Sequence, residues 1–195
     1  MTRFSIARSE LILGGQKSGK SRRAELLARH WLAESPAHDA VLIATAQPWD
    51  EEMRQRITRH QEDRAARVPK LRTLEEPLAL AQALTNCSQP HTLVVVDCLT
   101  LWLTNLLMPA ENNERNKPPA QEPHAQAAML LRAIEAASGP VVLVGNEIGL
   151  GVIPLGRETR AFVDALGLLN QQVAQACQRV TLMAAGLPLT LKGTL

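Results

Sequence analysis

The stretch Leu11-Ile12-Leu13-Gly14-Gly15-Gln16-Lys17-Ser18-Gly19-Lys20-Ser21 decides the fold of this 195-residue chain. Three apolar residues lead directly into a glycine-rich loop, and a helical pattern of apolar residues follows it. The loop matches G-x-x-x-x-G-K-[ST] at every specified position, in the strand–loop–helix setting that this motif requires. A glycine-rich turn with a chance Lys-Ser pair is the alternative, and the flanking patterns argue against it. We therefore predict a loop that holds the phosphates of a nucleoside triphosphate.

The residue types in this loop suit phosphate binding. Glycines let the backbone curl so that its N–H groups point at phosphate oxygens, and the dipole of the following helix adds to the attraction. We expect Lys20 to pair with the β- and γ-phosphates and the Ser21 hydroxyl to bind Mg²⁺. The predicted nucleotide contacts in the loop are Gly14, Gly15, Gln16, Lys17, Ser18, Gly19, Lys20 and Ser21.

Short, nearly continuous apolar runs recur along the chain and alternate with helical patterns. Such runs are typical of strands covered on both faces, so the alternation predicts a mostly parallel sheet between two helical layers. The runs after the loop are 41–44, 93–96, 141–144 and 180–183. A last run, 187–191, is expected to pair with 180–183 as a C-terminal edge hairpin across Gly186. The predicted fold class is α/β, a three-layer P-loop sandwich.

One long helix is indicated by apolar residues that follow each other in steps of four and three. Such a stripe covers one face of a helix and packs on a core. Its members are Phe162, Leu166, Leu169, Val173 and Ala176.

Composition limits the classes of protein that this chain can be. With 46% hydrophobic and 21% charged residues it reads as one globular domain, residues 1–195. A formal net charge of +2 predicts no nucleic-acid partner. The three cysteines fit neither a disulfide framework nor a zinc site, so we expect reduced thiols in a cytoplasmic protein. No apolar run approaches the ~20 residues of a membrane span.

Residues 109–123 are rich in Asn, Glu, Pro and Gln and almost free of apolar side chains. The pattern predicts a flexible surface loop that separates two helical patterns. A tolerated insertion is the plainer interpretation of this loop, and a lid over the substrate is the alternative.

Two acidic residues follow apolar runs and should reach the carboxyl edge of the sheet, where such folds bind ligands. Asp97 ends the run 93–96, and we predict that it holds Mg²⁺ together with Ser21. A helix cap before residues 99–107 is the alternative for Asp97. Glu147 follows the run 141–144, but a cap or turn role fits it nearly as well, so no role is assigned to it.

The segment 50–67 is crowded with charge, and within it Met53, Ile57 and His60 fall on one helical face. The plain interpretation is that His60 merely continues that face. The surroundings favour a catalytic role, because nearby arginines suit anionic phosphates and a neutral imidazole is a competent nucleophile near neutral pH. These arginines are Arg56, Arg59 and Arg64.

Two segments in particular carry a family resemblance. One is Asp50-Glu51-Glu52-Met53 followed by Arg56-Ile57 and His60, and the other is Asn146-Glu147-Ile148-Gly149-Leu150-Gly151-Val152-Ile153-Pro154. With the phosphate loop and Val96-Asp97-Cys98-Leu99-Thr100, they make the chain resemble, over nearly its whole length, the bifunctional adenosylcobinamide kinase/adenosylcobinamide-phosphate guanylyltransferase family of cobalamin biosynthesis.

The resemblance implies a RecA-like P-loop fold and two reactions. In the first, GTP or ATP phosphorylates the aminopropanol hydroxyl of adenosylcobinamide. In the second, GTP gives GMP to that phosphate through a GMP-histidine intermediate, for which His60 is the matching position. A homotrimer is also implied. The nucleotide contacts carried over beyond the loop are Ala44, Thr45, Ala46, Gln61, Glu62, Asp63, Arg64, Glu75 and Asp97.

Two other functions remain possible from the residues alone. One is a P-loop small-molecule kinase without guanylyl transfer, in which His60 would be structural. The other is a nucleotide-switched binding module, in which residues 109–123 would be a partner site.

Overall fold

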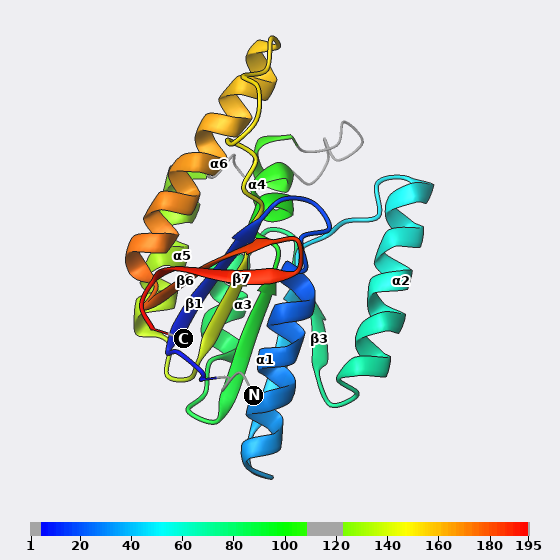
Figure 1. The fold of residues 1–195 in the computed structure, drawn as a ribbon, viewed down its shortest axis with the longest axis vertical. Helices are drawn as coiled ribbons and strands as arrows, with labels where there is room; N and C mark the ends of the chain where they lie inside the picture. The colour runs from blue at the N-terminus through cyan, green and yellow to red at the C-terminus, as the bar shows by residue number, and fades with distance from the viewer. Residues whose placement is uncertain (1–4, 109–122, 195) are drawn as a thin grey trace.

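The computed structural model describes residues 5–108 and 123–194, which build one seven-stranded sheet flanked by helices (Figure 1). The strands are β1 (Ser9–Gly14), β2 (Asp39–Ala44), β3 (Arg72–Glu75), β4 (Thr92–Asp97), β5 (Val141–Val144), β6 (Arg179–Ala184) and β7 (Leu187–Lys192). The helices are α1 (Lys20–Glu34), α2 (Glu51–Arg67), α3 (Leu80–Cys87), α4 (Leu99–Leu107), α5 (Pro123–Ala136) and α6 (Arg157–Ala176).

The strand order is β3-β2-β4-β5-β1-β6-β7, and every neighbouring pair is parallel except β6 and β7. The predicted strands and the predicted C-terminal hairpin are therefore confirmed. In this order β5 lies between β1 and β4, so the carboxyl ends of all three strands meet at one edge. Strand β3 was not predicted, because all four of its residues are exposed and no apolar run marks it.

Alternate residues of each strand face two separate helical layers, as the period of two in a strand requires. Leu11, Val94 and Leu143 belong to a core closed by α3, α4, α5 and α6. Ile12, Val95 and Val142 face the opposite side, where α1 covers the sheet. Both faces of the central strands are thus buried, which explains their continuous apolar runs and confirms the three-layer prediction.

The predicted stripe on the long helix is also confirmed. Leu166, Leu169 and Val173 of α6 are buried, and Phe162 and Ala176 pack partly buried against the same core.

Some sequence predictions concern residues that the structure does not describe. The loop predicted at 109–123 lies outside the described residues, apart from Pro123, which begins α5. Cys87, Cys98 and Cys177 are free thiols. Within 5–108 and 123–194, no helix is both long and apolar enough to cross a membrane.

A buried carboxylate joins the strand before the phosphate loop to the helix after it. Glu10 of β1 is 1% exposed. Its Oε1 accepts hydrogen bonds from Nε and Nη2 of Arg23 in α1, at 3.1 and 3.0 Å, and from the Thr181 hydroxyl of β6 at 2.8 Å. Its Oε2 accepts from Nη1 of Arg179, also in β6, at 3.2 Å. One negative charge therefore serves two buried guanidinium groups.

Replacing Glu10 by Gln should destabilise the fold by about 3–5 kcal/mol, because both arginines would stay buried without a counter-charge. Urea unfolding followed by circular dichroism measures this free energy. The matched control is Asp39→Asn, which weakens the exposed ion pair between Asp39 and Arg72 and should cost less than about 1 kcal/mol. Equal losses in the two variants would contradict the role assigned to Glu10.

Candidate functional site

The phosphate loop begins where β1 ends, and its glycines are required by its geometry. At Gly14 φ is 153°, and a Cβ atom there would lie 2.5 Å from the carbonyl oxygen of Met183. Gly19 caps the N-terminus of α1 in the left-handed region, with φ of 99°. A side chain at either glycine position would therefore be sterically unfavourable, which explains why the motif has glycine there.

Backbone hydrogen bonds from two neighbouring turns hold the loop in place. The N–H of Glu147, just after β5, donates to the carbonyl of Gly14 at 3.1 Å. The N–H of Gly186, in the turn between β6 and β7, donates to the carbonyl of Ser18, also at 3.1 Å. The loop is thus tied on two sides to the carboxyl edge of the sheet.

Two polar side chains of the loop are buried in a setting suited to an anion. Lys20 is buried, and its Nζ donates to the carbonyl of Gly15 at 2.6 Å. Burial lowers the pKa of Lys20 from its ordinary value, and Arg56 acts in the same direction, while Cys98 and Asp97 oppose them. The buried Ser18 hydroxyl oxygen has no hydrogen-bond partner among the described residues. A phosphate here would supply both the missing charge and the missing partner.

Asp97 ends β4 beside this loop, within electrostatic reach of Lys20. Its carboxylate is half-buried, and no described residue gives it a hydrogen bond or ion pair. The helix-cap alternative for Asp97 is wrong, because Cys98 is the N-cap of α4 and its Sγ accepts from the N–H of Leu101. A carboxylate and the Ser21 hydroxyl are oxygen donors of the kind that Mg²⁺ prefers.

The end of β2 shapes the neighbourhood of Asp97. Thr45 is fully buried, and its N–H donates to the carbonyl of Asp97 at 3.1 Å. Its hydroxyl donates to the carbonyl of Cys98 at 2.7 Å and accepts from the N–H of Cys98 at 2.9 Å. Thr45 therefore fixes the turn after Asp97, with its own hydroxyl and amide engaged inside the protein. Ala44 and Ala46 flank it and are half-buried.

Glu147 takes part in a local turn. Its Oε1 accepts from the N–H of Gly149 at 2.8 Å, which is the turn role left open by the sequence. Its backbone contact to Gly14 nevertheless places it beside the phosphate loop.

Helix α2, which carries His60, is attached to the rest of the protein mainly at its C-terminal end. Arg64 is its only buried residue, and Met53 and Ile57 are merely half-buried. Nη1 of Arg67 pairs with the buried carboxylate of Glu25 in α1. The residue after the helix, Val68, enters the core below α1. Figure 1 shows α2 standing beside α1, at the β3 edge of the sheet.

His60 is exposed, and by helical spacing it shares a face of α2 with the half-buried Ile57 and the buried Arg64. Arg56 precedes it by four residues and Arg64 follows it by four, so the three side chains are neighbours along one face. Arg56 is within electrostatic reach of Lys20 in the phosphate loop, and Arg64 is buried against the body of the protein. The imidazole is therefore flanked by two cations on this face.

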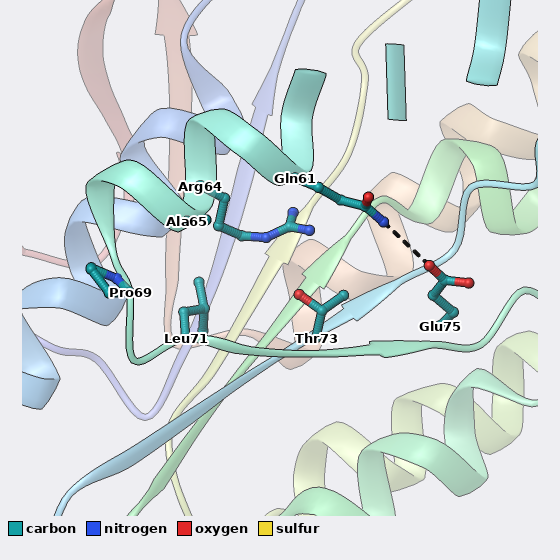
Figure 2. A pocket seen from close by; sticks show the side chains of 7 residues that line it. All are labelled: Gln61, Arg64, Ala65, Pro69, Leu71, Thr73 and Glu75. Carbon is teal, nitrogen blue, oxygen red and sulfur yellow. Dashed lines mark hydrogen bonds between the residues drawn. The ribbon is translucent and has the colours of Figure 1, made fainter. Parts of the chain in front are cut away.

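A cavity of about 290 Å³ lies between the C-terminal half of α2 and β3 (Figure 2). Figure 2 shows the Arg64 side chain pointing across it, and no described residue accepts a hydrogen bond from that guanidinium. At its rim, Nε2 of Gln61 donates to Oε1 of Glu75 at 3.3 Å. The lining residues are Gln61, Arg64, Ala65, Pro69, Leu71, Thr73 and Glu75. The sequence did not predict this cavity, because its wall is the exposed strand β3.

The structure does not bring all of the predicted contacts to this cavity. Gln61, Arg64 and Glu75 line it, whereas Glu62 and Asp63 are exposed and do not. Asp63 instead pairs with Nη2 of Arg67 at 2.8 Å within the helix.

Comparison with known proteins gives a consistent picture. The family described as CobU, cobinamide kinase / cobinamide phosphate guanyltransferase, matches residues 10–191. The chain is 47% identical over 184 residues to the bifunctional adenosylcobalamin biosynthesis protein CobP of Pseudomonas aeruginosa, covering 94% of this chain and 97% of the relative. It is 34% identical over 190 residues to the bifunctional adenosylcobalamin biosynthesis protein CobU of Escherichia coli, covering 93% and 98%.

Two solved structures share the fold. The flagellar accessory protein FlaH of Methanocaldococcus jannaschii superposes with a TM-score of 0.51 at 13% identity, covering 97% of this chain and 81% of that one. A Pyrococcus horikoshii protein gives 0.53 at 10% identity, covering 98% and 89%. At such identities the likeness concerns the fold alone. The family match and the curated relatives extend over nearly the whole chain, and the chain accordingly belongs to the cobinamide kinase/cobinamide phosphate guanyltransferase family.

Proposed function

We propose that this chain phosphorylates adenosylcobinamide and then transfers GMP from GTP to the resulting phosphate, with His60 as the nucleophile. Family membership supports the two reactions. The observation that carries the role of His60 is its place between Arg56, which lies within electrostatic reach of Lys20, and the buried Arg64. That setting concentrates positive charge around an imidazole, which suits attack on a nucleotide phosphate.

The kinase reaction needs positioning and charge stabilisation more than covalent chemistry. The backbone of residues 14–21 and the ammonium of Lys20 would hold the triphosphate of GTP or ATP. Mg²⁺, held by Ser21 and Asp97, would neutralise charge that develops on the phosphate oxygens. The substrate hydroxyl then attacks the γ-phosphorus, the bond from that phosphorus to the bridging oxygen breaks, and a nucleoside diphosphate leaves.

The guanylyl transfer is proposed to proceed in two displacements. A ring nitrogen of His60 attacks the α-phosphorus of GTP, the bond to the β-phosphate breaks, and pyrophosphate leaves. An oxygen of adenosylcobinamide phosphate then attacks the same phosphorus and breaks the P–N bond, which gives adenosylcobinamide-GDP and restores the imidazole. Arg56 and Arg64 are placed to stabilise negative charge during these steps.

The cavity beneath α2 supports binding of the guanine base. Guanine presents an N–H and an NH₂ group side by side, and a single carboxylate can accept from both. Glu75 offers such a carboxylate at the cavity rim, and Gln61 orients it through a hydrogen bond.

We also expect a homotrimer, as the family resemblance implies. Sedimentation velocity would measure the mass of the assembly in solution.

Changing His60 to Ala should abolish covalent labelling of the protein by α-labelled GTP, because no other group would form the phosphoramidate. The label on the unchanged protein should be acid-labile and base-stable. His124→Ala is the matched control, since His124 is an exposed histidine on α5, and it should keep the label. If the unchanged protein phosphorylates cobinamide but acquires no label, the chain is a kinase without guanylyl transfer and the proposed intermediate is wrong.

Changing Glu75 to Gln should lower the kcat/KM for self-labelling with GTP by about ten-fold or more, because an amide can accept from only one of the two guanine donors. ITP lacks the NH₂ group, so the same substitution should cost less with ITP than with GTP. Glu135→Gln, at an exposed acid on α5, serves as the control and should change neither rate. Equal losses with the two nucleotides would argue against base recognition by Glu75.

A further inference from the structure

Asn105 of α4 is a buried amide that binds carbonyl groups from two separate segments of the chain. It is 4% exposed. Its Nδ2 donates to the carbonyl of Thr45, just after β2, at 2.8 Å, and to the carbonyl of Pro77, after β3, at 3.1 Å. Because both partners are acceptors, the NH₂ side of the amide must face them, and it has one hydrogen for each. A single side chain therefore links the carboxyl ends of β2 and β3.

This link begins where the backbone hydrogen bonds between β2 and β3 end. Ala44 and Glu75 are the last paired residues of the two strands, and the Glu76 N–H donates to the carbonyl of Ala44 at 2.9 Å. The next residue, Pro77, has no N–H to donate. The Asn105 amide therefore joins the two segments at the point where a proline prevents the backbone from doing so.

A second side chain of α4 holds the same loop after β3. Trp102 is fully buried, and its Nε1 donates to the carbonyl of Leu78 at 3.0 Å. Trp102 precedes Asn105 by three residues, so the two side chains are neighbours on the helix. The loop is thus held to α4 at two consecutive carbonyls, those of Pro77 and Leu78.

The same hydrogen bonds reach the end of β4. The Thr45 N–H donates to the carbonyl of Asp97 at 3.1 Å, while the Thr45 carbonyl accepts from Asn105. Only Cys98 separates Asp97 from the start of α4. Asn105 therefore places the segment that carries Glu75 and the segment that carries Asp97 in one connected set of hydrogen bonds.

We propose that Asn105 is a positioning residue that fixes the Glu75 carboxylate for recognition of the guanine base. This inference rests on the proposed function, in which Glu75 accepts from both donors of guanine. Asn105 does not line the cavity between α2 and β3, so it acts through the backbone that carries Glu75.

The surroundings of Glu75 explain why its backbone needs such support. Glu75 is exposed on an edge strand, and the hydrogen bond that its side chain accepts from Gln61 comes from α2, a helix that buries only one residue. A carboxylate that pairs with two donors of one base needs a fixed position. The backbone after β3, held by Asn105, supplies that position.

The test is a double-mutant cycle between Asn105→Ala and Glu75→Gln, with the Kd for GTP and for ITP measured by isothermal titration calorimetry. Every protein in the cycle also carries His60→Ala, so binding is measured without covalent transfer. We expect Asn105→Ala to raise the Kd for GTP about five-fold or more and the Kd for ITP by a smaller factor, because ITP lacks one of the two donors. In the Glu75→Gln background the same change should raise the Kd for GTP less than about two-fold.

The matched control is Asn86→Ala, at an exposed asparagine on α3, which should change neither Kd. Asn105→Ala leaves two carbonyls without their partner, so its folding is checked by circular dichroism. If it does not fold, Trp102→Phe replaces it in the cycle, since this change keeps an aromatic ring and removes the bond to the Leu78 carbonyl. We then expect the same pattern, with a smaller rise in the Kd for GTP.

A purely structural role for Asn105 predicts a different result. It would raise the Kd for GTP and for ITP by the same factor, and by the same factor with Glu75 or Gln at position 75. Either outcome would overturn the inference while leaving the proposed function intact. If Glu75→Gln alone does not change the Kd for GTP, base recognition by Glu75 is itself wrong, and the inference about Asn105 is overturned with it.

Discussion

The hydrogen bonds between the Glu10 carboxylate and the Arg23 guanidinium determine how the phosphate loop is closed. Glu10 lies in the strand that enters the loop, and Arg23 lies in the first turn of the helix that leaves it. Their contact fixes the spacing between the end of β1 and the start of α1, and therefore the curvature of residues 15–19 between them. Arg179 and Thr181 extend the same network to β6, whose turn with β7 donates a backbone N–H to Ser18. Buried charge thus gives the loop a rigid base.

Helix α2, in contrast, is held to the rest of the protein by few buried contacts. It buries a single side chain, Arg64, and its C-terminal end is tied to α1 by the pair of Arg67 and Glu25. A helix with so little apolar burial can shift at low cost in free energy, because few packed contacts would be lost. The covalent transfer proposed above would require His60 to reach the α-phosphorus, and a helix held at one end can bring a side chain from its middle toward the loop. The firmly held loop therefore suits phosphate binding, whereas the lightly anchored helix suits the delivery of a side chain that has to move.

The sequence predicted those parts of the fold that have a local signal. Strands β4 and β5 are buried on both faces, so each appears as an unbroken apolar run, and the phosphate loop has a motif. Strand β3 has no such signal, since Arg72–Glu75 lies at an exposed edge. The cavity lined by β3 was not predicted for the same reason. The hydrogen bonds by which Thr45 holds the Asp97–Cys98 turn had no local signal either, and the nucleotide contact predicted for Thr45 stays a prediction. Networks such as that of Glu10 join residues more than 160 positions apart, which no local pattern can reveal.

The topology also separates the two partners of the phosphate loop. Helix α2 is joined to α1, on one face of the sheet, whereas Asn146, which follows β5, is hydrogen-bonded to α4 and α6, which cover the other face. The loop lies between them at the carboxyl edge, within electrostatic reach of Arg56 on one side and hydrogen-bonded to Glu147 on the other. A nucleotide in the loop would therefore have α2 on one side and the turn after β5 on the other.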